Sequence, residues 1–236
     1  MTQPNPDPTY KADLVRYLQE SREALLWKLD GLSEYDARRP LTPTGTNLLG
    51  LVKHLSGVEL GYFGDTFGRP YFTEEQPPPS WWWTETDDPH ADMYATPDES
   101  REEITGLYRR AWEHAQATFD ALPLDAVGRV PWWPEERSAV TLHHIMVRVN
   151  ADTQRHAGHA DILRELLDGA AGLIRGKDAL ATDDAESWAR HRERVEQAAG
   201  ERRPAEPSAP GRPAHRSVSA GTSSDASSVP SPLARS

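Results

Sequence analysis

Apolar residues recur every three or four positions in four long segments of the chain, which is the spacing expected of amphipathic helices. A fifth and weaker pattern of the same kind runs from Asp184 to Ala198. The chain has no run of alternating β-branched residues bounded by hairpin turns, so no β-strand is expected. We therefore predict an all-α fold, a four-helix bundle on which a short fifth helix can dock. The four main helices are predicted at about residues 10–32, 48–63, 96–119 and 141–167.

Residues that favour helix ends mark the limits of two of these segments. For the third helix, Thr96 suits the N-cap and Glu99 completes a capping box with it. For the fourth, Gly169 is placed to end the helix. Local chemistry therefore predicts a start at Thr96 and a stop just before Gly169.

The connection between the second and third helices, about residues 64–95, is unusually long for a bundle. It contains the runs Pro77–Pro79 and Trp81–Trp83, so it is both stiff and aromatic. A loop of this composition is expected to fold over another part of the protein. Two interpretations stay open: a lid or wall of a binding pocket, or a simple cover for one end of the bundle.

Composition limits the domain organisation and the partners. Of 236 residues, 37 are acidic and 26 are Lys or Arg, and the net charge of −11 argues against nucleic acid as a partner. The apolar stretches are too short to cross a membrane, and the polar start of the chain does not resemble a signal peptide, so we expect a cytoplasmic protein. From Ser208 onward the chain has too few large apolar residues to offset the entropy of ordering. We predict a bundle domain over residues 1–200 and a disordered tail over residues 201–236.

One group of histidines and carboxylates is placed to face the bundle interior. His54 lies next to the apolar stripe of the second helix, and Asp152 and His156, four residues apart, share a face of the fourth. Because the chain has no cysteine, a metal ion would need such ligands, and this set suits Zn²⁺, Fe²⁺ or Ni²⁺. Two alternatives stay open. Asp152 and His156 form a plain polar pair, or His159 completes a triad with His54 and His156.

Two segments of the chain resemble the DinB-like superfamily, in particular its actinobacterial branch of mycothiol-transferase-like proteins. They are residues 45–59, GTNLLGLVKHLSGVE, and residues 155–165, RHAGHADILRE. The resemblance extends over about residues 10–198, and the preference for arginine over lysine is typical of a G+C-rich genome. It implies a four-helix bundle that holds a divalent metal ion with one histidine from the second helix and two ligands four residues apart in a later helix.

Carried over to this chain, the resemblance assigns His54 and His156 as metal ligands. The position four residues before the last histidine is a histidine in many members, and a glutamate in the similar mycothiol-dependent maleylpyruvate isomerases. Here it is Asp152, a shorter carboxylate. His159 falls where many relatives carry glutamine, which favours a supporting role for it.

The resemblance also implies a reaction: transfer or isomerisation that uses a low-molecular-weight thiol such as mycothiol, activated as a thiolate by the metal, most simply zinc, against an electrophilic substrate. Weaker candidates for orienting substrate or ligands are Glu59, Arg148, Arg155 and His159. The alternatives are a non-catalytic, stress-associated metal-binding protein and a metal-dependent hydrolase with Glu59 or His159 as its base. Bundles of this kind often pair through helix faces, so a homodimer is a further hypothesis.

Overall fold

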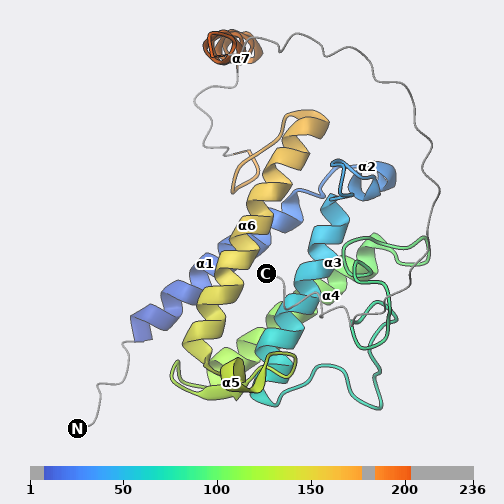
Figure 1. Ribbon diagram of the computed structural model, residues 1–236, viewed down its shortest axis with the longest axis vertical. Coiled ribbons are helices and arrows are strands. Elements are labelled where there is room, and N and C mark those ends of the chain that lie inside the picture. The colour runs from blue at the N-terminus through green and yellow to red at the C-terminus, as the bar shows by residue number, and fades with distance from the viewer. Residues whose placement is uncertain (1–7, 177–183, 203–236) are drawn as a thin grey trace, which may run out of the picture. The chain divides into compact units, whose positions relative to one another are not determined.

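A computed structural model describes residues 8–176 and 184–202 of the chain, and the described part is mainly helical (Figure 1). In chain order the elements are α1 (Pro8–Trp27), α2 (Glu34–Arg38), α3 (Leu48–Glu59), the π-helical segment η1 (Leu60–Gly64), the 3₁₀ turn η2 (Asp65–Phe67), α4 (Arg101–Ala121), β1 (Val127–Arg129), α5 (Glu135–Ser138), β2 (Ala139–Thr141), α6 (Leu142–Asp168) and α7 (Ala185–Gly200).

Four long helices form the core. α1 packs along α6, and α3 packs against both α4 and α6. The buried apolar side chains that they contribute form one cluster, which includes Leu18 of α1, Leu55 of α3, Phe119 of α4 and Ile145 of α6. Among the described residues, no helix is both long and apolar enough to span a membrane.

A small antiparallel pair of strands, β1 and β2, corrects the expectation that the fold has no β-structure. Gly128 pairs with Val140, and each strand has only three residues. A strand this short cannot show an alternating pattern in the sequence. Strand β1 packs closely against the end of the preceding helical segment. A methyl group at Gly128 would lie 2.5 Å from the carbonyl oxygen of Thr66.

Two helix ends differ from the prediction. α1 ends at Trp27, because the chain turns there and Gly31 adopts a left-handed conformation (φ 73°) before α2. α4 begins at Arg101, with a complete capping box made by Ser100 and Glu103. The predicted cap residue Glu99 does accept a hydrogen bond from the Thr96 backbone N–H, but it closes a turn outside the helix.

The fourth predicted helix agrees closely with α6. The side chain of Thr141 caps its N-terminus, and Gly169 ends it in a left-handed conformation (φ 80°). α7 agrees with the fifth pattern and starts after Asp184. It belongs to a separate unit and none of its residues is buried, so its docking stays a prediction. Most of the predicted tail, from residue 203, lies outside the described residues.

Every residue of α3 is buried, including its polar ones. Glu59 is fully buried, and both of its carboxylate oxygens accept hydrogen bonds from the Arg22 guanidinium of α1, one of them at 2.9 Å. The Nζ of Lys53 donates to Glu99 at 2.8 Å and to two carbonyl oxygens of the long loop, those of Ala91 and Tyr94. Interior charges on α3 are therefore neutralised by other elements.

The long loop packs against α3 and against η1, the segment that follows α3. Trp81 and Trp82 are buried in a second apolar cluster with Leu60. A methyl group at Gly57 would lie 2.7 Å from a ring carbon of Trp83, so a larger residue there would displace this tryptophan. Trp81 and Trp83 thus cover α3 around Lys53 and Gly57.

The Arg22–Glu59 pair generates a prediction about stability. Glu59→Ala leaves an unpaired guanidinium in the core and is expected to lower the free energy of unfolding by about 3–5 kcal/mol, measured by urea denaturation. The double variant Arg22→Met/Glu59→Met should recover much of this loss, because no charge remains buried. Glu20→Ala, which breaks an exposed pair with Arg16, is the control. Equal midpoints for Glu59→Ala and Glu20→Ala would contradict the prediction.

Asp65 generates a second prediction, which concerns pH. Burial raises the pKa of its carboxyl group from 3.8 to about 6. Between these values the folded chain keeps a proton that the unfolded chain loses, so this residue lowers stability as the pH rises from about 4 to about 6. Asp65→Asn should therefore raise the melting temperature at pH 7 and have little effect below pH 4. A difference that does not change with pH would show that the carboxylate charge is not the cause.

Candidate metal centre

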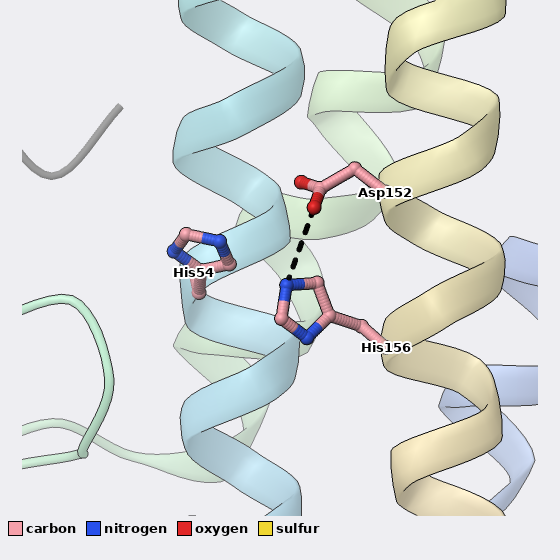
Figure 2. A group of neighbouring side chains, drawn as sticks. All are labelled: His54, Asp152 and His156. Carbon is pink, nitrogen blue, oxygen red and sulfur yellow. Dashed lines mark ion pairs between the residues drawn. The ribbon is translucent and has the colours of Figure 1, made fainter. Parts of the chain in front are cut away.

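α3 and α6 bring together three of the side chains predicted from the sequence (Figure 2). His54 projects from α3 toward α6, where Asp152 and His156 lie one turn apart on the facing side. One potential ligand atom from each residue lies within 4.8 Å of the other two. The rings of His54 and His156 meet edge to face, with centroids 5.0 Å apart.

A second carboxylate supports His54. The Nδ1 atom of His54 lies 2.7 Å from Oδ2 of Asp92, a buried residue of the long loop. With Nδ1 engaged, the Nε2 atom of His54 is the one left to bind a metal ion. A carboxylate that orients a ligating imidazole in this way is a common feature of metal sites.

Sequence reasoning missed Asp92, because no spacing rule connects a loop residue with a helix 38 positions earlier. The loop is fixed locally by contacts with α3. The side-chain amide of Asn47 donates to the Met93 carbonyl oxygen, and a methyl group at Gly50 would collide with that oxygen at 1.9 Å. The proline and tryptophan content of the loop indicated that it folds over something, but not which of its side chains enters the site.

The electrostatics of the site follow from burial. Burial raises the pKa of Asp152, although His54, Arg148 and Arg155 act in the opposite direction. Burial, with a smaller contribution from nearby His54, lowers the pKa of His156 to about 3. His156 is therefore a neutral imidazole, which is the form that binds metals.

The donor set passes a test of fit to a divalent cation. Nε2 of His156 lies 3.5 Å from Asp152, which is long for a hydrogen bond, and its buried Nδ1 has no hydrogen-bond partner among the described residues. A plain polar pair would instead bring Nε2 of His156 within hydrogen-bond distance of the Asp152 carboxylate. Two imidazoles and a carboxylate are typical ligands of Zn²⁺, and Fe²⁺ or Ni²⁺ also accept them.

The other predicted site residues lie in different places. The ring of His159 is 5.4 Å from that of His156, but the residue is exposed on α6. Arg148 and Arg155 line a cavity of about 550 Å³ that reaches Asp152. Glu59 is separate from this group and forms the inter-helix pair with Arg22.

Fold and site together define a mainly helical protein with a His-Asp-His group between two of its helices. The family model described as Mycothiol-S-transferase matches residues 13–169, and the chain belongs to this family. The match confirms the predicted resemblance to mycothiol-transferase-like proteins. It runs from within α1 to the end of α6 and so includes His54, Asp92, Asp152 and His156. The search of curated proteins found no match.

The Asp92 contact generates a prediction about metal affinity. Asp92→Asn removes the carboxylate charge behind His54 and should weaken Zn²⁺ binding by about 10–100-fold. Competition with a chelating indicator dye measures this affinity. Asp87→Asn makes the same change at an exposed position of the same loop and serves as the control. If both variants bind Zn²⁺ like the wild type, Asp92 does not support a metal ligand.

Proposed function

We propose that this protein is a divalent-metal-dependent S-transferase that uses a low-molecular-weight thiol such as mycothiol. The observation that carries the proposal is the convergence of His54, Asp152 and His156 beside an open cavity, in a member of the mycothiol-S-transferase family. In this proposal a four-helix bundle is formed by α1, α3, α4 and α6, and Zn²⁺ is the preferred ion.

The chain has no cysteine of its own, so the nucleophilic sulfur must come from the thiol substrate. A bound Zn²⁺ lowers the pKa of a coordinated thiol and so favours the thiolate at neutral pH. In the transfer the thiol proton passes to water and a sulfur electron pair forms the new S–C bond. The leaving group departs from carbon with the electrons of its former bond.

The residues of the chain hold and shape this site. Asp92 fixes the ring of His54, and Asp152 and His156 face it from α6. The tryptophan-rich loop supplies Asp92 and packs against α3, so it supports His54 from behind, while the described lining of the cavity comes from α6. Removing water from around a thiolate strengthens its electrostatic interactions with the site.

The alternatives fit the site less well. A structural zinc ion usually has four protein ligands, whereas the described residues offer a group of three. Hydrolysis needs a base close to the bound water, but Glu59 is engaged with Arg22 in the core and His159 is exposed on α6. These points favour a catalytic site that takes an exogenous thiol.

The proposal predicts both metal content and activity. Wild-type protein purified without chelator should contain about one divalent ion per chain by elemental mass spectrometry. After loading with Zn²⁺ it should transfer mycothiol to monobromobimane faster than the uncatalysed reaction. His156→Ala should lose the ion and fall to the uncatalysed rate, whereas His90→Ala, at an exposed histidine of the loop, should keep both.

The two measurements separate the interpretations. A wild type that binds Zn²⁺ but does not catalyse transfer, beside an active reference enzyme, would favour a binding role. A wild type that fails to bind Zn²⁺, Fe²⁺ or Ni²⁺ would contradict the metal centre itself.

A further inference from the structure

Among its described lining, the cavity beside the metal centre has more basic than acidic side chains, although the chain as a whole carries −11. It runs along α6 and is lined by two arginines, Arg148 and Arg155, and by His143 and His144. Asp152 is the one acidic residue among its described lining, and it is a proposed metal ligand. With that carboxylate bound to a cation, the described lining would present arginine and histidine side chains to an anion.

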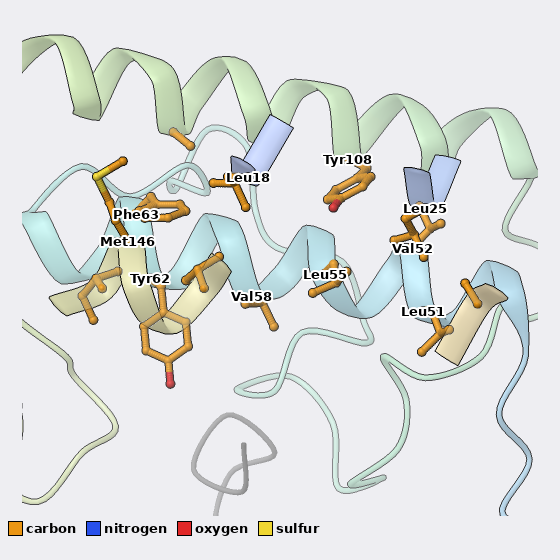
Figure 3. Packing of buried hydrophobic residues seen from close by; sticks show 14 of the residues in the cluster. Leu18, Leu25, Leu51, Val52, Leu55, Val58, Tyr62, Phe63, Tyr108 and Met146 are labelled. Carbon is orange, nitrogen blue, oxygen red and sulfur yellow. The ribbon is translucent and has the colours of Figure 1, made fainter. Parts of the chain in front are cut away.

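Arg148 is held in a fixed orientation by aromatic side chains. Its Nε donates to the hydroxyl oxygen of Tyr62 at 3.1 Å, and its guanidinium carbon lies 5.3 Å from the Tyr62 ring and 5.1 Å from the Trp133 ring. Figure 3 shows that the hydroxyl group of Tyr62 points away from α4, whereas the ring of its neighbour Phe63 lies between α3 and α4. A guanidinium whose orientation is already fixed loses less entropy when it binds a carboxylate.

The position of Arg148 relates it to the reacting centre. Arg148 lies four residues before Asp152 on α6, and Arg155 lies three residues after Asp152. These separations correspond to about 6 Å and about 4.5 Å along the helix axis, on one face of the helix. An anionic group bound by Arg148 would therefore leave the rest of a small molecule beside Asp152. The exposed Arg155 adds positive charge at the other end.

We propose that this cavity binds the electrophile and selects electrophiles that carry a carboxylate, which Arg148 holds. The assignment rests on the proposed S-transferase function. With an aryl chloride the thiolate forms the S–C bond, the C–Cl bond breaks, and chloride leaves with its electron pair. The carboxylate takes no part in bond making and only positions the carbon.

A matched pair of substrates tests the proposal: 4-chloro-3,5-dinitrobenzoate and its neutral amide, each with mycothiol and Zn²⁺-loaded protein. The readout is the ratio of kcat/KM for acid over amide, after correction for the uncatalysed rates. Arg148→Met should lower this ratio by about 10–100-fold, as expected for loss of a charged hydrogen-bonding group. Arg148→Lys should recover part of it. Arg16→Met, which changes an arginine over an exposed tyrosine of α1, should keep the wild-type ratio.

Binding separates this inference from the function on which it rests. By calorimetry, unreactive 3,5-dinitrobenzoate should bind the Zn²⁺-loaded protein more tightly than 3,5-dinitrobenzamide, and Arg148→Met should remove the preference. If neither chloride substrate turns over but this preference depends on Arg148, the proposed function fails and the anion site stands. If Arg148→Met keeps the full preference, the carboxylate binds the metal ion instead, and the anion site is overturned. A wild type that shows no preference for the acid over the amide would also overturn it. Should Arg148→Met fail to fold, Arg148→Lys takes its place: a partial loss of the preference supports the site, and an unchanged preference overturns it.

Discussion

Burial of α3 on every side is the constraint on which the rest of the structure depends. An ordinary bundle helix keeps one face in water, where its polar residues need no protein partner. In α3 each residue from Leu48 to Glu59 is buried, and two of them carry charges. A charge removed from water is tolerated only when another group neutralises it and satisfies its hydrogen bonds. Other elements of the fold must therefore supply partners to this one helix.

Those partners connect the core with the site. Arg22 from α1 pairs with Glu59, while Glu99 and two loop carbonyl oxygens surround the ammonium group of Lys53. The same stretch of loop supplies Asp92 to His54. Because Lys53 and His54 are adjacent, the contacts that bury the lysine also position the carboxylate behind the histidine. The arrangement of the candidate metal centre is thus a consequence of how α3 is covered, and the loop is as much a part of it as the two helices.

Features set by local chemistry could be predicted from the sequence, and features set by distant contacts could not. The limits of α6 follow from Thr141 and Gly169, and the meeting of Asp152 with His156 follows from helical spacing. Nothing local indicates that Lys53 is buried, or that Asp92 turns inward, because both depend on how the loop folds back. The start of α4 shows the same limit. Thr96 has a suitable capping sequence, yet the chain between it and Ser100 forms a turn that offers Glu99 to Lys53.

The π-helical segment Leu60–Gly64 has a consequence for how the site and the cavity can vary in evolution. Its wider turns use i→i+5 hydrogen bonds and so accommodate one more residue than α-helical turns. The extra residue is taken up within the segment, so the elements on both sides of it keep their register with their neighbours. Tyr62 of this segment contacts Arg148 beside the cavity, whereas His54, Asp152 and His156 lie outside the segment. A change in length of one residue there would therefore alter the contacts of Tyr62 and leave the positions of the His-Asp-His group unchanged.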